Sequence, residues 1–358
     1  MAPTRLRQPL AALLVLALAA LVFVVAGRGE APREPRTALA ARALDAQPLI
    51  SFRVDATAQQ AITWRGGPVT ASTGEVVRVF VSNSIPLEVT TPEAWGELLS
   101  GLTHGPELAS LTTRIAPIAE VQEICGPRTL GCYGPNEMIA PSEPASDGTP
   151  PEEVLRHEYG HHIAFHRQNP PWRAIEWGPK HWASVANVCA RAARDEVFPG
   201  QGGRNYALNP GEAWAEVYRL MDERKAGITT ATWPIVSPSL YPTEAAFQAA
   251  ERDVLTPWTA GRTLSFRRTF GGQATRPWWI RLATPLDGDL RLTATVPRGG
   301  LHEVALVAGN RTTVLQRGQW VSQRAKRLSR AVCGQRSLFV RVTLRGTPGQ
   351  VRVTVSAP

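Results

Sequence analysis

The chain has 358 residues, and division by about 150 residues per domain indicates two folded units rather than one. Its net charge is +9, from 39 basic and 30 acidic side chains, and nearly all of the basic ones are arginines scattered along the chain. Because no block of basic residues interleaved with aromatics occurs, the composition argues against a nucleic-acid-binding protein. We interpret the excess as surface charge that favours contact with anionic cell-envelope polymers.

The N-terminus has the pattern of an export signal. A positively charged stretch precedes an uninterrupted apolar run from Leu10 to Ala26, and Val24 and Ala26 fit the small-residue rule for cleavage. A run of about 17 apolar residues also reaches the lower limit for a membrane-spanning helix, so an uncleaved anchor stays open. We assign residues 1–27 to a signal peptide or membrane anchor, with secretion favoured. Residues 28–48, rich in Arg, Ala, Glu and Pro, are expected to be a linker.

The chain contains four cysteines, at Cys125, Cys132, Cys189 and Cys333. An even set in an exported chain predicts disulfides, and three pairings are open. We favour Cys125 with Cys132, which closes a short loop. That leaves Cys189 with Cys333, which would tie the C-terminal region to the central one. The alternative is that these last two are buried free thiols.

Residues 49–261 are expected to form the first domain. The β-branched runs at 49–54 and Gly74–Ser82 are separated by Gly66–Pro68, which predicts strands with a turn between them. A capping threonine and a first-turn proline then predict a helix that begins near Pro92 and packs on this sheet.

Two apolar stretches between Ile118 and Pro141 flank a bend rich in Cys, Gly and Pro. They predict a hairpin that a bond between Cys125 and Cys132 would staple. Its second strand, near Glu137 to Ala140, has two interpretations that stay open. It is either an edge strand, which could pair with an extended peptide through backbone hydrogen bonds, or an ordinary internal strand.

The stretch HEYGHH, His157–His162, combines two imidazoles and a carboxylate in a pattern typical of zinc hydrolases. His157 and His161 are four residues apart, so a helix places both on one face, where they can bind one metal ion. Glu158 falls beside that face and can hold a water bound to the metal. The next histidine, His162, is interpreted as a packing residue.

Several helix signals surround this motif. Thr149 and Glu152 predict a capping box, from which the metal helix runs to about Arg167. A further helix is expected over 179–194. The Gly-rich segment 198–204 predicts a flexible loop over or near the site.

A second helix with acidic residues begins at Asn209, where a capping residue is followed by proline and, at the third position, by Glu212. Glu212 and Glu216 are four apart and share one face. The third metal ligand cannot be a histidine of the extended metzincin motif, because Ala164 and Arg167 stand where that motif needs Gly and His. We therefore expect Glu212 to be the third ligand of a Zn²⁺ site and Glu216 to accept the ring N–H of a ligating histidine. The alternative exchanges these two roles.

The stretches HEYGH and NPGEAWAEVYRLM together resemble the gluzincin superfamily of zinc peptidases. The second stretch is similar to that of the anthrax lethal factor branch, and the resemblance covers these two helices. It implies a zincin-like metallopeptidase domain that hydrolyses peptide bonds with Glu158 as general base. In that branch a tyrosine helps to stabilise the transition state, and Tyr206 occupies a comparable place. No sequence like the GAMEN motif of the aminopeptidases occurs.

From Arg262 onward the sequence changes to short alternating runs separated by turn signals, which is typical of an antiparallel β-sandwich over 262–358. The runs 340–344 and 351–355 flank a Gly- and Pro-containing turn and predict a final hairpin. Trp278 and Trp279 suggest carbohydrate stacking, although core packing is the more common explanation.

The sequence therefore predicts an α+β chain in which a zincin-like metallopeptidase domain precedes an antiparallel β-sandwich. The expected function is that of a secreted zinc peptidase acting on peptide or protein substrates, with its oligomeric state left open. One alternative is a catalytically inactive, zinc-bearing surface binding or adhesion protein on a peptidase scaffold. Another is hydrolysis of cell-wall crosslink peptides. The remaining histidines are expected to be surface or hydrogen-bonded core residues, namely His104, His181 and His302.

Overall fold

The computed structural model describes residues 62–358, apart from 231, 234, 273–275, 298–300, 322–325 and 345–346. The predicted export segment, the linker and the strand at 49–54 lie outside the described residues. Within the described part, no helix is both long enough and apolar enough to span a membrane. Helices and strands are mixed up to residue 141, helices follow up to residue 255, and strands make up the regular structure of the described residues after that, in agreement with the predicted α+β class.

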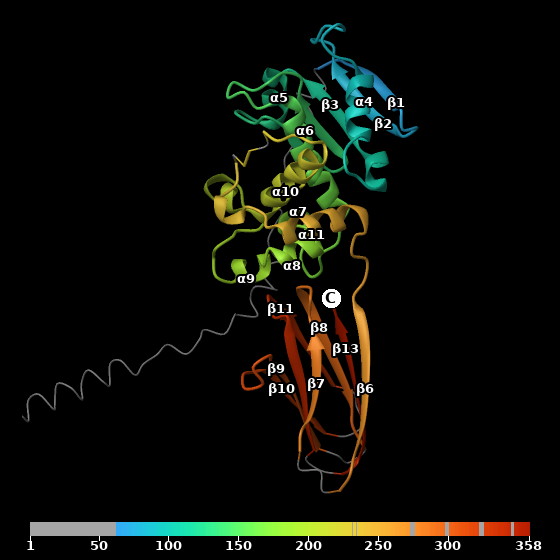
Figure 1. The fold of residues 1–358 in the computed structure, drawn as a ribbon, viewed down its shortest axis with the longest axis vertical. Coiled ribbons are helices and arrows are strands. Elements are labelled where there is room, and N and C mark those ends of the chain that lie inside the picture. Colours follow the sequence, from blue (N-terminus) through green and yellow to red (C-terminus); the bar gives the residue numbers. More distant parts are fainter. Residues whose placement is uncertain are drawn as a thin grey trace, which may run out of the picture. The chain divides into compact units, whose positions relative to one another are not determined.

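A five-stranded mixed sheet opens the described chain, with the strand order β1-β2-β3-β5-β4 (Figure 1). Its strands are β1 (Trp64–Thr70), β2 (Val76–Ser82), β3 (Thr112–Ala116), β4 (Cys132–Gly134) and β5 (Glu137–Pro141). β2, β3 and β5 are parallel, whereas β1 and β4 pair antiparallel at the two edges. Val77, Val79 and Val81 of β2 are buried, as expected for a β-branched run that faces a core.

The predicted turn at Gly66–Pro68 is wrong, because these residues lie within β1 and pair with β2. The chain reverses instead between Ala71 and Glu75, where the Ala71 N–H donates to the Glu75 carbonyl. Gly66 has a φ of 119°, and a Cβ there would lie 2.3 Å from the carbonyl oxygen of Val79. The glycine therefore allows a close strand pairing, and the proline is tolerated because β1 is an edge strand.

The predicted hairpin between Ile118 and Pro141 is also wrong in its first half. Residues Ile118–Cys125 form a helix, α5, which buries Val121 and Ile124 at helical spacing. β5 lies between β3 and β4, so the interpretation of its segment as an internal strand is confirmed. The edge strand on this side is the three-residue β4.

The helices of the N-terminal half pack around this sheet and around one another. They are α4 (Pro92–Ser100), α5 (Ile118–Cys125), α6 (Pro151–Phe165), α7 (Ala174–Trp177), α8 (Lys180–Val185), α9 (Val188–Ala192), α10 (Pro210–Lys225) and α11 (Glu244–Leu255). Short 3₁₀ segments are η1 (Pro106–Ser110), η2 (Gly203–Leu208) and η3 (Pro238–Leu240). The predicted helix near Pro92 is confirmed as α4, and its cap Thr91 accepts the Ala94 N–H at 3.3 Å.

Two helix boundaries differ from the prediction. The metal helix α6 begins at Pro151 without a side-chain cap, because Thr149 Oγ1 donates to Asp147 at 2.8 Å and the expected capping box does not form. The helix expected over 179–194 is divided into α8 and α9, because Asn187 adopts a left-handed conformation with a φ of 53°. Helix α10 begins as predicted, since Asn209 Oδ1 accepts the Gly211 N–H at 3.0 Å.

Helices α6 and α10 approach closely because Gly160 faces Ala215 across their contact. A Cβ on Gly160 would lie 2.7 Å from the Cα and 3.0 Å from the carbonyl oxygen of Ala215. The indole N–H of Trp214 donates to the Gly160 carbonyl at 2.7 Å, which fixes the two helices in register. This close packing brings side chains of α10 on both sides of Ala215 toward those of α6.

Substitution Gly160→Ala should therefore destabilise the chain. The contact is with backbone, which cannot move aside, so overpacking of about 1–3 kcal/mol exceeds the gain of about 1 kcal/mol in helix propensity. Chemical denaturation measures the loss. The control Gly101→Ala adds a Cβ with contacts no closer than 3.4 Å and should change stability by less than about 0.5 kcal/mol. A Gly160→Ala variant as stable as wild type would contradict this account of the helix contact.

Two four-stranded antiparallel sheets form the C-terminal part, with the orders β10-β9-β12-β7 and β11-β8-β13-β6. Their strands are β6 (Arg262–Phe270), β7 (Trp278–Ala283), β8 (Gly288–Thr295), β9 (Leu301–Ala308), β10 (Val314–Val321), β11 (Lys326–Val332), β12 (Ser337–Leu344) and β13 (Gly349–Ala357). Apolar side chains of both sheets enter one core, in which Val340 of β12 and Val353 of β13 are fully buried. This arrangement agrees with the predicted β-sandwich. The predicted division of the chain at residue 261 falls between this core and the N-terminal one and stays a prediction.

The predicted final hairpin over 340–344 and 351–355 is wrong. β12 pairs with β7 and β9, whereas β13 pairs with β6 and β8 in the other sheet. A Gly- and Pro-containing connection indicates a change of direction, but it does not determine whether the next strand pairs with the previous one or crosses the core. The alternating valines satisfy either arrangement, because each strand has one face toward the same core.

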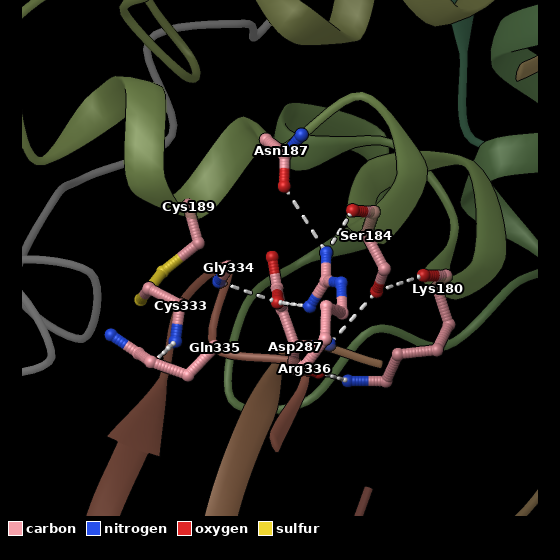
Figure 2. Close-up of a disulfide and its surroundings, with 9 residues drawn as sticks. All are labelled: Lys180, Ser184, Asn187, Cys189, Asp287, Cys333, Gly334, Gln335 and Arg336. Atoms are coloured by element: carbon pink, nitrogen blue, oxygen red, sulfur yellow. Dashed lines mark hydrogen bonds and ion pairs between the residues drawn. A yellow bond between two sulfur atoms is a disulfide. The ribbon is translucent and has the colours of Figure 1, made fainter. Parts of the chain in front are cut away.

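Both favoured disulfide pairings are confirmed, as Cys125–Cys132 and Cys189–Cys333. The second joins α9 to the segment after β11, 144 residues later, among polar contacts shown in Figure 2. There the guanidinium of Arg336 pairs with Asp287 and donates to the Ser184 carbonyl. The buried ammonium of Lys180 donates to the Asp287 carbonyl at 2.8 Å. These contacts link the helical part of the chain to the sandwich.

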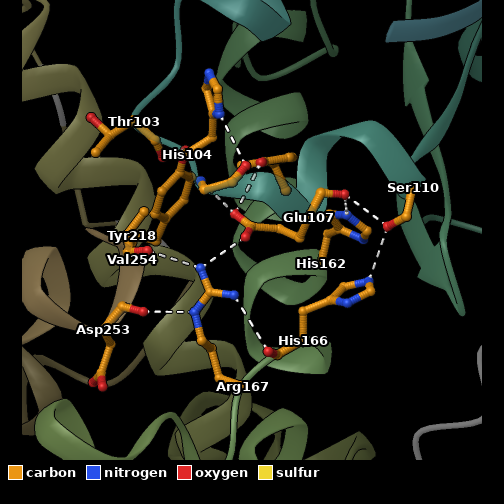
Figure 3. A network of polar contacts seen from close by, with 12 residues as sticks. Thr103, His104, Glu107, Ser110, His162, His166, Arg167, Tyr218, Asp253 and Val254 are labelled. Carbon is orange, nitrogen blue, oxygen red and sulfur yellow. Dashed lines mark hydrogen bonds and ion pairs between the residues drawn. The ribbon is translucent and has the colours of Figure 1, made fainter. Parts of the chain in front are cut away.

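His162 takes part in a polar network at the C-terminal end of α6 (Figure 3). It does not belong to the face of the helix that carries His157 and His161. Its Nε2–H donates to the Glu107 carbonyl at 2.9 Å and its Nδ1 accepts from the Tyr133 hydroxyl at 3.1 Å. Burial lowers the pKa of His162 to about 4, so the ring is neutral. Arg167 pairs with the Glu107 carboxylate at 2.9 Å and donates to the Asp253 carbonyl, which holds the end of α6 in place. The interpretation of His162 as a packing residue fits these contacts.

The other histidines and the sandwich tryptophans differ in their surroundings. His104 pairs with Glu75 at 3.2 Å, and His181 donates to Asp253 at 2.7 Å. His302 is buried as expected for a core residue, but neither ring nitrogen has a hydrogen-bond partner in the described chain.

Trp278 packs against the sandwich core, and Trp279 packs edge-to-face on Phe339, which favours core packing over carbohydrate stacking. These two rings are half-buried.

Candidate metal centre

Helices α6 and α10 bring together His157, His161 and Glu212, the three predicted ligands. Their ligand atoms lie within 4.8 Å of one another, and all three side chains are buried. The Glu212 Oε2 atom is 3.4 Å from His157 Nε2 and 3.3 Å from His161 Nε2. One carboxylate oxygen thus faces the Nε2 atoms of both rings. A donor set of two imidazoles and one carboxylate fits a divalent metal ion of the kind found in hydrolytic sites.

The structure places Glu216 behind His157 rather than among the ligand atoms. Glu216 Oε2 lies 3.1 Å from His157 Nδ1 and accepts a hydrogen bond from it, so the other ring nitrogen, Nε2, faces Glu212. The sequence left two arrangements open. This geometry corresponds to the one in which Glu212 is the ligand and Glu216 is the hydrogen-bond partner of the ligating His157. An N–H held in this way fixes the tautomer and the orientation of the ring.

Arg219 is a residue of the site that the sequence reasoning missed. It is 1% exposed and binds Glu216 through Nε at 3.0 Å, with further ion pairs to Glu153 at 3.0 Å and Glu223 at 2.7 Å. Its position three residues after Glu216 on the same helix face is the sequence signal that could have identified it. Through Glu216 the arginine fixes the position of His157.

Glu158 follows the first predicted ligand on α6 and has one carboxylate oxygen without a hydrogen-bond partner in the described chain. The side chain is 7% exposed, and its Oε2 atom is buried without any hydrogen bond in the described chain. Buried polar atoms are nearly always hydrogen-bonded, so an orphaned carboxylate oxygen beside the donor set indicates a place for a water or substrate atom. A Cβ on Gly131 would lie 3.0 Å from the other oxygen of Glu158, so this glycine makes room for the carboxylate.

A cavity of about 360 Å³ opens onto these groups. Its apolar wall includes Leu130, Val154 and Ile235, and its polar lining includes the three predicted ligands, Glu158 and Glu216. The loop between the two cysteines of the short disulfide contributes residues 128–131 to the rim. A second cavity, of about 380 Å³, is lined by residues 164–175 and contains none of the predicted site residues.

Tyr206, on η2, lines the same cavity as the metal-binding group. Burial, together with the negative charge of Glu212 and a hydrogen bond to it, raises the pKa of Tyr206, so the phenol keeps its proton. The prediction that this tyrosine lies at the site therefore agrees with its position. The Gly-rich segment 198–204 leads into η2, and its predicted place over or near the site stays a prediction.

The ionisation of the site follows from its burial and its close pairs. Burial favours a neutral His157, but hydrogen bonds to Glu212 and Glu216 outweigh this effect and raise the pKa of His157 to about 10. Burial would raise the pKa of Glu212, but the charges of His161 and His157 hold it below its usual range. For Glu158 the balance is reversed, and burial raises its pKa despite both imidazoles.

Metal binding should therefore release protons and strengthen with rising pH. A metal ion binds the neutral ring, whereas His157 without metal carries a proton below its pKa of about 10. Between pH 7 and 9 we expect about one proton to be released per bound divalent metal ion, and the metal affinity to rise about tenfold per pH unit. Calorimetry in buffers of different ionisation enthalpy counts the protons. Affinity that stays constant over this range, with no proton release, would contradict the ionisation described here.

The chain matches no protein-family model and no curated protein. Among solved structures, a pre-peptidase C-terminal domain of collagenase from Bacillus anthracis is 12% identical, with a TM-score of 0.22 over 27% of this chain and 89% of that chain. A mitogen derived from Yersinia pseudotuberculosis is 7% identical, with a TM-score of 0.22 over 27% and 87%. Legionella pneumophila aminopeptidase A, in complex with aspartic acid, is 9% identical, with a TM-score of 0.25 over 77% and 36%. Likenesses at this level carry no argument about what this chain does.

Proposed function

We propose that this chain is a zinc-dependent peptidase of the gluzincin type, in which residues 49–261 form a zincin-like catalytic domain. The observation that carries the proposal is the convergence of His157, His161 and Glu212 beside the unpartnered, buried Oε2 of Glu158. A purely structural metal site would have no use for a carboxylate kept without a partner at the wall of a cavity. This feature favours an enzyme over an inactive binding protein on the same scaffold.

His157, His161 and Glu212 would hold the zinc ion. When bound, zinc acts as a Lewis acid that makes a water acidic and polarises a substrate carbonyl. Glu158 accepts the proton of the attacking water at Oε2 and later delivers it to the leaving amine nitrogen. Its raised pKa suits this exchange, because a carboxyl group that must take and return a proton works best when its pKa approaches the operating pH.

The remaining side chains of the site stabilise the transition state and hold the zinc ligands and the substrate in position. Tyr206 keeps its proton and donates a hydrogen bond to the oxyanion that develops on the scissile carbonyl. Glu216 and Arg219 hold the ring of His157 in one orientation, so that the reacting groups need no rearrangement. The apolar wall of Leu130, Val154 and Ile235 accommodates a substrate side chain and excludes water.

The substrates are peptides or proteins outside the cytoplasm. Two disulfides fit an oxidising compartment, and the predicted export signal gives a route to it. We infer that the chain is secreted. The two C-terminal sheets would serve as an accessory module beside the catalytic domain.

The proposal is tested by offering the zinc-loaded full chain an unfolded protein, a broad peptide library and peptidoglycan. New amino termini in the protein or the library, identified by mass spectrometry, are the expected result. If only peptidoglycan is cleaved, the substrates are the crosslink peptides of the cell wall and not free peptides or proteins. Tight binding of a peptide with no cleavage of any substrate would favour the inactive binding protein.

A further inference from the structure

Charge is divided very unevenly between the two parts of the chain. Residues 262–358 contain 17 basic and 3 acidic side chains, a net charge of +14, whereas residues 1–261 contain 22 basic and 27 acidic ones, a net charge of −5. The positive charge of the protein therefore comes from the sandwich. A charge of this size within one small domain opposes folding by self-repulsion, which makes an anionic partner the natural explanation.

Four of these arginines lie on the outer face of one sheet, β11-β8-β13-β6. On β8 and β13 alternate residues such as Leu292 and Val353 enter the core, so their neighbours face outward. Three adjacent rungs of outward residues contain all four arginines, namely Arg267, Arg291, Arg327 and Arg352. All other side chains of these rungs are serines or threonines. We call these three rungs the arginine–hydroxyl face.

Arg267 and Arg352 stand directly opposite each other on paired strands. Like charges in this position are destabilising, and neither arginine has an ion pair within the described chain. Arg291 has an ion pair, with Asp289 at 3.6 Å. On the other sheet, by contrast, Arg341 pairs with Glu303 at 3.0 Å and Arg311 packs over Phe339. The arginine–hydroxyl face thus gathers four arginines, of which only Arg291 has an ion pair in the described chain.

We propose that the arginine–hydroxyl face binds a linear anionic polysaccharide. Guanidinium groups bind carboxylate, sulfate or phosphate groups in a bidentate manner, and the opposed pair Arg267 and Arg352 can hold one such group between them. The hydroxyl side chains around them match the hydroxyl groups of sugar rings. No aromatic side chain occurs in the three rungs, which argues against the base stacking that single-stranded nucleic acids require. No large apolar side chain occurs there either, which argues against insertion into a lipid bilayer.

The test uses the full chain and measures binding, so it does not depend on peptidase activity. Two polysaccharide probes, polygalacturonate and heparin, are compared with neutral dextran, duplex DNA and vesicles of phosphatidylglycerol. The variant Arg267→Gln, Arg291→Gln, Arg352→Gln removes three charges from the face. The control variant Arg276→Gln, Arg281→Gln, Arg317→Gln removes three charges from exposed positions of the sandwich outside it.

We expect at least one polysaccharide to bind with a salt-dependent affinity, and dextran not to bind. The face variant should weaken binding by about tenfold or more, and the control variant by less than about threefold, because contacts to the ligand are local. The face variant should unfold at the same temperature as wild type or higher, since it removes the opposed pair. Equal weakening by both variants, no binding of either polysaccharide, or tighter binding of DNA or vesicles would overturn the proposal.

Discussion

Replacing Glu158 by Gln should abolish peptide hydrolysis while leaving the metal ion in place. The carboxylate is close to the donor set but not part of it, and its Oε2 atom has no partner in the described chain. Glutamine keeps the shape of the side chain but cannot accept a proton from water. We expect turnover to fall by about 10²–10⁴-fold, the usual contribution of a general base. Rates of peptide cleavage and zinc content, measured on the same samples, give the two readouts.

The control for this variant is Glu152→Gln. Glu152 is exposed on the first turn of the same helix, and its carboxylate has no hydrogen bond or ion pair in the described chain. The Glu152→Gln variant should retain both its zinc and full turnover. Undiminished cleavage by the Glu158 variant, or loss of its zinc, would show that Glu158 does not act as the base.

Replacing Glu212 by Ala should remove the metal ion. Glu212 Oε2 faces the Nε2 atoms of both histidines, at 3.3 and 3.4 Å, so its loss removes one of three ligands. We expect zinc affinity to fall by more than about 100-fold, because removal of an outer partner alone costs about 10–100-fold. Competition with a chromogenic chelator measures the affinity. The variant Glu212→Gln preserves the volume of the side chain and separates loss of the ligand from loss of packing.

Glu216→Gln provides the comparison. Glu216 touches His157 only at Nδ1, at 3.1 Å, and not at the nitrogen that faces Glu212, so zinc affinity should fall by about 10–100-fold and turnover should persist at saturating zinc. If the Glu216 variant loses zinc completely and the Glu212 variant retains it, the two carboxylates have the opposite roles.

The parts of the site that follow from helix periodicity were predictable from the sequence. His157 and His161, and likewise Glu212 and Glu216, repeat at four residues, and this spacing places each pair on one helix face. What periodicity could not give is the distance between the two faces. That distance depends on the contact between Gly160 and Ala215, which are 55 positions apart in the chain. The only sequence signal of this contact is that both residues are small.

The errors in the fold have a common cause, which is that local signals do not identify the partner of a segment. Gly66–Pro68 has turn composition, yet pairing with β2 keeps it extended. The run Ile118–Cys125 is apolar enough for a strand, but burial of Val121 and Ile124 on one side makes it a helix. The last two strands look like a hairpin and instead belong to opposite sheets. The disulfides were correctly paired because sequence separation alone favoured the short loop, which left one remaining pair.

The central claim is that His157, His161 and Glu212 hold one zinc ion that makes the chain a peptidase. Its most direct test is a titration in which the full chain, stripped of metal by a chelator, receives zinc in fractions of an equivalent while cleavage of an unfolded protein is followed. We expect no cleavage before zinc is added and a linear rise to a plateau at one equivalent. Cleavage that persists in the stripped chain, or no cleavage at any amount of zinc, would contradict it.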